Sequence, residues 1–188
     1  GKEGRGMGTV FERNQGGVEA WEKVERLNQH VRHVFESVGA FLDLSAHTAV
    51  LGSDNYSTGN TEGGNAYIYS RDPGGVSSPW TYVQRIELWE GTVPVALSGN
   101  VLVVGVGNKY LAHIHVRHAG GPDYWGRIHT IHAPLQPSAL GFGGRVAISG
   151  DTVAIGCEPA YASSEYSSVF IYQRNAGGAD QWGLVREI

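Results

Sequence analysis

The chain has 188 residues, 41% of them hydrophobic, and a formal net charge of -4 at pH 7. This size and composition suit one soluble globular domain, and the acidic balance argues against a nucleic-acid-binding surface. No apolar run approaches the roughly 20 residues that a membrane-spanning helix needs, and a single cysteine, Cys157, excludes an internal disulfide framework.

One phrase of residue types recurs four times along the chain. Each copy has an arginine, a Gly-Gly pair, a tryptophan, and aliphatic residues three and six positions after the tryptophan. The arginines and tryptophans of the four copies are Arg13 and Trp21, Arg71 and Trp80, Arg117 and Trp125, and Arg174 and Trp182. The tryptophan spacings of 59, 45 and 57 residues predict an array of supersecondary units, each of which needs a neighbour to bury its apolar surface.

A second block precedes three of the four phrases. It reads LDLSAHTAVLG at 42–52, VALSGNVLVVG at 95–105 and VAISGDTVAIG at 146–156. Each copy predicts two short apolar strands joined by a tight hairpin turn. A third strand then ends at the arginine, with aromatic residues on one face and β-branched residues on the other, and a fourth strand begins at the tryptophan.

These units predict an all-β fold, a partial β-propeller of four-stranded antiparallel blades with about three and a half blades in this chain. We expect a half blade of strands three and four plus a connection in 1–33, and blades in 34–87, 88–133 and 134–188, all within one propeller domain. Residues 1–10 offer no first hairpin for the half blade. We therefore expect the remaining blades or strands to come from a longer polypeptide or from a partner chain.

The blade sequence resembles the FG-GAP repeat of integrin-α-like β-propellers. Phe142-Gly143 supplies the FG pair, and Gly156-Cys157-Glu158-Pro159 stands where Gly-Ala-Pro is usual in that family; other blades have Val38-Gly39 and Gly91-Thr92 instead of FG. The resemblance implies an extracellular or cell-surface propeller used in adhesion or scaffolding. The calcium loop of that family is not expected here, because the hairpins hold too few oxygen ligands.

Variable loops between strands two and three are expected on one rim of the propeller, where binding residues concentrate on a rigid scaffold. The candidate ligand-binding residues are Asp54, Tyr56, Glu62, Lys109, Tyr110, Glu158, Tyr161 and Glu165. Asp54, Asn55 and Glu62 are weak candidates for a calcium site, no other cofactor is expected, and Asn55 begins an N-glycosylation pattern that matters if the source is eukaryotic and secretory. The alternative is that these polar loops only solvate the rim.

Three other features have competing interpretations. A zinc or copper site is suggested by five histidines: His113, His115, His118, His129 and His132. However, His113 and His115, which share a face, occupy positions that are aromatic in other copies and so fit packed residues between blades. The four arginines and four tryptophans recur at fixed positions, which indicates a structural role. Asp43 interrupts an innermost strand and is a candidate for an ion site at the central channel.

The leading functional hypothesis is a non-enzymatic structural or interaction module that binds protein or glycan through its rim loops. One alternative is an assembly subunit that is completed by strand pairing with another chain, because an unpaired edge is a template for β-augmentation. A second alternative is a hydrolase or lyase that uses the propeller as a scaffold. No Ser/His/Asp order, paired carboxylates, phosphate loop or metal motif supports that alternative.

Overall fold

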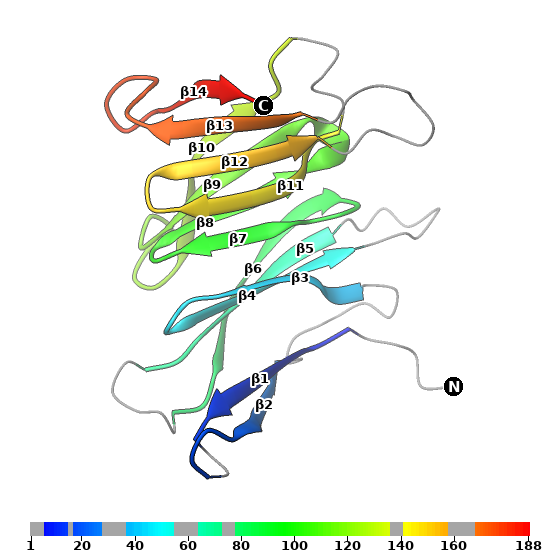
Figure 1. Ribbon diagram of the computed structural model, residues 1–188, viewed down its shortest axis with the longest axis vertical. Helices are drawn as coiled ribbons and strands as arrows, with labels where there is room; N and C mark the ends of the chain where they lie inside the picture. The colour runs from blue at the N-terminus through cyan, green and yellow to red at the C-terminus, as the bar shows by residue number, and fades with distance from the viewer. Residues whose placement is uncertain are drawn as a thin grey trace.

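The chain forms antiparallel β-sheets. The structure, a computed structural model, describes residues 6–14, 17–27, 37–54, 64–72, 78–135, 141–157 and 168–188. Within these residues, three sheets have four strands and one has two, and strands that follow one another in sequence pair within each sheet (Figure 1). We name them sheets I to IV in chain order.

The strands have the following bounds. Sheet I contains β1 (Gly8–Arg13) and β2 (Trp21–Leu27). Sheet II contains β3 (Ser37–Leu44), β4 (Thr48–Asp54), β5 (Gly64–Ser70) and β6 (Thr81–Glu90). Sheet III contains β7 (Val95–Ser98), β8 (Val101–Val106), β9 (Leu111–Arg117) and β10 (Trp125–His132), with the short 3-10 helix η1 (Gly107–Lys109) between β8 and β9. Sheet IV contains β11 (Phe142–Ser149), β12 (Thr152–Cys157), β13 (Val169–Arg174) and β14 (Trp182–Glu187).

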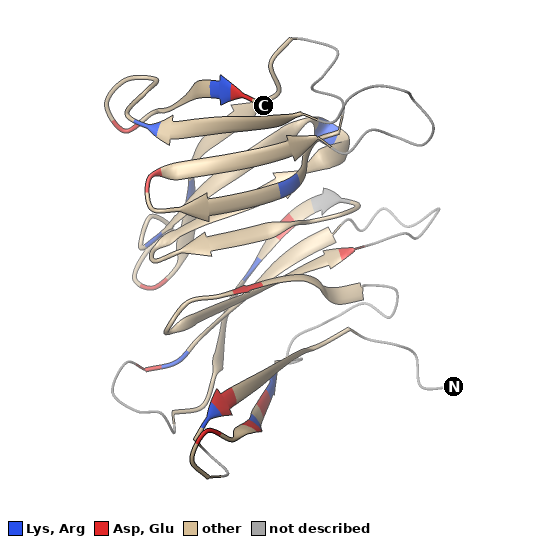
Figure 2. Cartoon of the chain, in the orientation of Figure 1, with Lys and Arg blue, Asp and Glu red and all other residues tan. Residues whose placement is uncertain are grey.

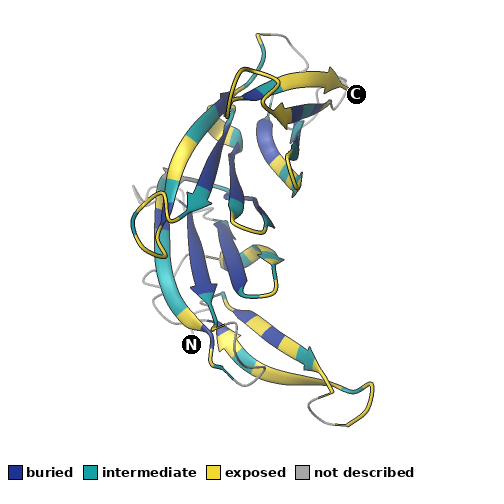
Figure 3. Cartoon of the chain, turned by 90° about the vertical axis from the view of Figure 1, so that its left-hand side faces the viewer, coloured by how far each residue is buried: buried dark blue, intermediate teal, exposed yellow. Residues whose placement is uncertain are grey.

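The four sheets lie face to face along an arc, with sheet I at one end and sheet IV at the other (Figure 3). This arrangement confirms the predicted fold class: the chain is an all-β, partial β-propeller of four-stranded antiparallel blades. Sheet I supplies strands three and four of a blade, as its sequence phrase indicates, and β6 continues to Glu90, past the division expected at residue 87.

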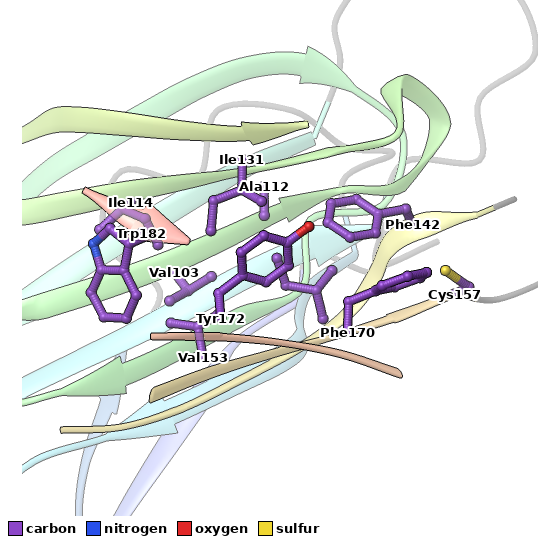
Figure 4. Packing of buried hydrophobic residues seen from close by; sticks show 11 residues of the cluster. Val103, Ala112, Ile114, Ile131, Phe142, Val153, Cys157, Phe170, Tyr172 and Trp182 are labelled. Carbon is purple, nitrogen blue, oxygen red and sulfur yellow. The ribbon is translucent and has the colours of Figure 1, made fainter. Parts of the chain in front are cut away.

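Each pair of neighbouring sheets shares an apolar core. Between sheets III and IV, aromatic side chains of sheet IV face small and β-branched side chains of sheet III (Figure 4). This pattern follows from the alternation of side chains along strand three of each sheet. Ile114 of β9 points toward sheet IV, and Tyr172 of β13 points toward sheet III. Burial on both faces is what allows a strand with no polar side to be stable in water.

A β-bulge occurs at the same step of strands three and four in every sheet. The pairing register shifts between Val10 and Phe11, Ile68 and Tyr69, Arg127 and His129, and Ile171 and Tyr172. In each case the shift skips the aliphatic residue three positions after the tryptophan: Val24, Val83, Ile128 and Val185. A bulge raises the local twist of a strand pair, so this residue bends each outer strand pair in the same way.

The backbone conformation explains why the FG pair contains a glycine. Gly143 has φ +89°, a conformation that other residues rarely adopt, and it lies in the register shift at the start of β11. Gly39 has φ +90° at the corresponding place in β3. Val38-Gly39 therefore adopts the same backbone feature as Phe142-Gly143, although its sequence matches the family motif less well.

Candidate interaction surface

In the described residues, strand two of sheets II, III and IV ends on one rim of the arc, which we call the loop rim (Figure 1). Asp54 ends β4 on this rim, where its carboxylate accepts a hydrogen bond from the Thr92 hydroxyl at 3.0 Å. Six of the predicted loop residues, Asn55, Tyr56, Glu62, Glu158, Tyr161 and Glu165, lie outside the described residues. Of the candidate calcium ligands, the structure describes only Asp54. Its hydrogen bond with Thr92 fixes the segment that leads into β7 of sheet III.

Tyr110 is an exposed predicted binding residue in the described part of the loop rim. It ends η1 in the left-handed conformation, with φ 56°, and 46% of its surface is exposed. Its carbonyl accepts a hydrogen bond from the Ala133 N–H at 2.9 Å, which fixes the η1 turn to the end of β10. Lys109 precedes Tyr110 in the same turn.

Leu135 lies on the same rim and was not singled out from the sequence. It follows Ala133 by two residues and is fully exposed. An apolar side chain in a Pro-containing connection gives no periodic signal, so only the structure shows that it shares a rim with Tyr110. Tyr110 provides an aromatic ring of the kind enriched at interfaces, Leu135 adds an exposed aliphatic group and Lys109 adds a cation.

The opposite rim, which we call the turn rim, carries the repeated arginines. Arg117 pairs with Asp123 and Arg174 with Asp180, each at 2.7 Å, and Arg13 pairs with Glu19. Each acidic residue also donates its backbone N–H to a side chain next to the arginine: Glu19 to Asn14, Asp123 to His118 and Asp180 to Asn175. Charged residues of both signs accordingly gather near these turns (Figure 2). The pairs define the turn, although exposed ion pairs stabilise a fold only slightly.

Arg71, in the turn between β5 and β6 of sheet II, differs from the other three arginines because it contacts a neighbouring sheet. Its guanidinium pairs with Glu12 of β1 and lies 5.0 Å from the centre of the Trp80 ring. Its Nε donates to the Ala46 carbonyl at 3.3 Å. The ion pair with Glu12 links sheets I and II, and the cation–π contact holds the guanidinium against Trp80 of its own sheet. The Arg71–Glu12 pair is less exposed to solvent than the ion pairs on the turn rim.

The two histidines of β9 are buried between sheets II and III. His113 is 9% exposed and its Nδ1 lies 3.0 Å from the Thr130 hydroxyl, whereas His115 is 5% exposed and both of its ring nitrogens are without a hydrogen-bond partner. Burial, with smaller effects of Arg127 and His132, lowers the pKa of His113 to about 4, and burial, with smaller effects of His113 and Arg127, lowers the pKa of His115 to about 4. Both rings therefore pack as neutral aromatic groups.

We expect this pair to make the fold sensitive to acid. In the unfolded chain these histidines take up protons near pH 6.5, but in the folded chain they do so only near pH 4. Their contribution to the free energy of unfolding is therefore constant above pH 6.5 and decreases as the pH falls from 6.5 toward 4. At pH 5.5 the free energy of unfolding should be about 2 kcal/mol lower than at pH 7.5. Urea unfolding at the two pH values measures this difference.

The double variant His113→Phe, His115→Phe should lose most of that pH dependence, because phenylalanine fills the same space without titrating. His129→Gln, on the neighbouring strand β10, serves as the control and should keep it. Equal pH dependence in the double variant and the wild-type chain would show that these two histidines are not responsible.

Asp43 bonds to backbone groups. Its Oδ1 accepts from the Leu44 N–H at 2.8 Å and its Oδ2 accepts from the Leu97 N–H of the next sheet at 2.7 Å. Both carboxylate oxygens are engaged, and the bond to Leu97 ties innermost strand β3 to β7. The structure thus gives Asp43 a connecting role in place of the ion site considered from the sequence.

Removing this connection should be measurable. We expect Asp43→Ala to lower the free energy of unfolding by about 1–3 kcal/mol, because it leaves the Leu97 N–H without its acceptor. Asp43→Asn retains one acceptor oxygen and should cost less. Asp151→Ala removes an exposed carboxylate on the turn rim and should change stability by less than about 0.5 kcal/mol. Equal urea midpoints for Asp43→Ala and Asp151→Ala would contradict the role given to Asp43.

Cys157 packs in the core between sheets III and IV. It is 7% exposed, and burial, with a smaller effect of Glu187, raises the pKa of its thiol to about 11. A thiol with this pKa is protonated at neutral pH and is a poor nucleophile. Among the residues that the structure describes, no group of three or more His, Cys, Asp or Glu side chains is placed to hold a metal ion.

Two leucines on the innermost strand of sheet II are unusually exposed. Leu42 is 65% exposed and Leu44 is 54% exposed, whereas Val95 and Leu97, which hold the same positions in sheet III, are each 7% exposed. Val95 and Leu97 are covered by sheet II, but among the described residues sheet I has no inner strands that could cover Leu42 and Leu44. Their exposure agrees with the half blade expected in 1–33, for which the sequence offers no first hairpin.

No protein-family model and no curated protein matches the chain. The chain is similar to the solved structure of Sqt1 from Saccharomyces cerevisiae, with a TM-score of 0.47 and 14% identity over 80% of this chain and 34% of Sqt1. It is also similar to a europium-containing methanol dehydrogenase, with a TM-score of 0.47 and 12% identity over 82% of this chain and 27% of that one. The chain thus spans about a third of the first structure and about a quarter of the second.

The described residues include no helix with the length and apolar character needed to cross a bilayer.

Proposed function

We propose that the chain is a non-enzymatic interaction module, a propeller segment that binds protein or glycan through its loop rim. The observation that supports this most directly is the exposed Tyr110, whose carbonyl is bonded to the Ala133 N–H, together with the fully exposed Leu135 two residues after Ala133. A solvent-facing aromatic ring on an ordered backbone can bind a partner with little loss of conformational entropy. Strand two of sheets II and IV ends on the same rim, at Asp54 and Cys157, immediately before the loops that vary most in sequence, and variable loops on a rigid scaffold are where binding residues concentrate.

The proposal includes an extracellular or cell-surface location and a relationship to the FG-GAP propellers. Its support is the sequence resemblance, together with the shared positive φ of Gly39 and Gly143 at the start of strand one. We propose no metal or other cofactor for the interaction. If the chain is made in a eukaryotic secretory pathway, Asn55 is the expected glycosylation position.

The test compares three forms of the chain on glycan arrays and against displayed libraries of surface proteins. The wild-type chain should select ligands that the double variant Tyr110→Ser, Leu135→Ser binds much more weakly. Tyr124→Ser is the matched control, because Tyr124 is 51% exposed on the turn rim and should not matter. Ligands that bind all three forms equally, or the absence of ligands, would contradict the proposed use of the loop rim.

A second function, as an assembly subunit completed by strands from another chain, is favoured by one specific observation. Among the described strands β1 pairs only with β2, so its other edge is free, and the exposed Leu42 and Leu44 lie where the inner strands of sheet I would pack. A free edge beside an uncovered apolar patch is suited to an incoming β-hairpin.

A peptide with the sequence of residues 144–156, which forms most of an inner hairpin in sheet IV, is a suitable probe for this second function. It should bind the intact chain and slow amide hydrogen exchange along β1. The variant Leu42→Glu, Leu44→Glu should bind it much more weakly, and a scrambled peptide should not bind. Unchanged exchange along β1 at saturating peptide would exclude this mode of completion.

A further inference from the structure

Three tryptophans of the repeat are buried in the same kind of contact. Trp80, Trp125 and Trp182 are 3%, 3% and 5% exposed, and each shares an apolar cluster with the sheet that precedes its own. For Trp182, the residues of the preceding sheet in that cluster come from strands two, three and four (Figure 4): Val103, Ala112, Ile114 and Ile131. We call such a set of four positions a socket.

The socket of sheet II has the same composition. Trp125 clusters with the residues at the four equivalent positions, Val50, Ala66, Ile68 and Ile86. The strand-four member of each socket lies six positions after the tryptophan of its own sheet and is buried against the following sheet. These residues are Leu27, Ile86 and Ile131, which are 3%, 8% and 3% exposed. The sheet-to-sheet contact is therefore one interface that repeats along the arc.

Sheet IV carries a socket that no described residue fills. Its four positions are Ala154, Val169, Ile171 and Ile188. Ile188 is 71% exposed and Val169 is 38% exposed, and Ala154 and Ile171 are half-buried, whereas Val103 and Ile114 in sheet III are fully buried. The backbone of this edge is ordered, because Val169 and Ile188 exchange two hydrogen bonds of 3.0 and 2.9 Å.

Sheet I carries the complementary half of the interface. Trp21 is 66% exposed, although its three counterparts are almost completely buried. Phe11, on the same face, is 54% exposed, whereas its counterparts Tyr69, His115 and Tyr172 are 1%, 5% and 5% exposed. Figure 3 shows that sheets I and IV lie at opposite ends of the arc, so this tryptophan cannot reach the socket of its own chain.

We propose that a second copy of this chain covers these two faces, with Trp21 of one copy seated in the Ala154–Val169–Ile171–Ile188 socket of the next. The contact is continuous with the interface that already joins the sheets, and both halves of it are exposed on the same molecule. Because the two faces differ, the association is head-to-tail, and it ends either when the ring closes or as an open chain of copies.

The test uses sedimentation equilibrium of the intact chain over a range of concentrations. The wild-type chain should associate reversibly, and its mean mass should rise with concentration. Trp21→Ala should weaken the association by about 30-fold or more, the effect of removing a hot-spot residue. Ile188→Asp should have a similar effect from the other face; this residue is at an exposed strand end, so the variant should fold, and Ile171→Lys provides a second change in the same socket.

A mixing experiment separates this contact from non-specific association of apolar surfaces. The Trp21→Ala chain retains an intact socket and the Ile188→Asp chain retains an intact tryptophan, so an equimolar mixture should form a 1:1 complex that does not grow further. Tyr124→Ser, an exposed aromatic substitution away from both faces, should associate like the wild-type chain.

Three results would overturn the proposal. The first is a wild-type chain that stays monomeric at every concentration, which would assign the two faces to other partners, such as further blades of a longer polypeptide. The second is an association that neither variant weakens. The third is a mixture of the two variants that behaves as two monomers.

Discussion

Replacing Gly105 by alanine is expected to lower the free energy of unfolding by about 3 kcal/mol, near the upper end of the cost of overpacking a core. Gly105 ends the VALSGNVLVVG block, and an added methyl group would lie far inside van der Waals distance of the Gly143 carbonyl oxygen in the next sheet. That oxygen belongs to backbone and cannot move aside without separating sheets III and IV. Urea unfolding followed by circular dichroism measures the loss.

Gly156→Ala is the matched control, because Gly156 ends the equivalent block in sheet IV. A methyl group there would lie 3.2 Å from the Arg145 Cβ and would meet no carbonyl oxygen of another sheet closely. The expected cost is below about 1 kcal/mol. Equal losses for the two variants would show that the glycine is required within its own sheet and not for contact between sheets.

These glycines illustrate how far the sequence alone determines the fold. Repetition of Gly52, Gly105 and Gly156 at the end of strand two is visible in the sequence, and it helped to identify the blade. At Gly52 and Gly105 its cause is a backbone carbonyl, of Val93 and of Gly143, that lies dozens of residues later in the chain. A local pattern can indicate that a small residue is needed, but only the packed sheets show what approaches it.

The aliphatic residues of the tryptophan phrase show a similar limit. The sequence marks the positions three and six after each tryptophan as equivalent apolar sites. The structure separates them, because Ile128 is skipped at a bulge and is 47% exposed, whereas Ile131 is 3% exposed and fills the interface with sheet IV. Regular alternation would place Trp125 and Ile131, six positions apart, on the same face; with the bulge between them, Trp125 packs toward sheet II and Ile131 toward sheet IV.

The candidate site was less predictable than the fold. Variable loops indicate a rim, and Tyr110 is on it, but Leu135 belongs to a connection with no repeat pattern. The sequence left Asp43 open to ion binding, because a lone carboxylate among apolar residues does not reveal its partner. That partner is the Leu97 N–H, a backbone group that every sequence position possesses.

Replacing Trp125 by alanine is expected to lower the free energy of unfolding by about 3–5 kcal/mol, as for other large aromatic side chains removed from a core. Trp125 is 3% exposed and lies in the cluster that joins sheets II and III, so the cavity would open in the middle of the arc. Its backbone N–H and carbonyl bond to the Gln84 side chain at 2.8 and 3.1 Å, which limits how far the strand can collapse into that space.

The same substitution at Trp21 provides the control, because it is chemically identical and differs only in its surroundings. Trp21 is 66% exposed on sheet I, and Trp21→Ala should cost less than about 1 kcal/mol when urea unfolding is measured at a concentration where the chain is monomeric. At high concentration its cost should grow, because the wild-type chain alone would gain stability from association. Similar losses for both variants in dilute solution would mean that the tryptophan acts within its own sheet, which would contradict packing between sheets as the source of stability.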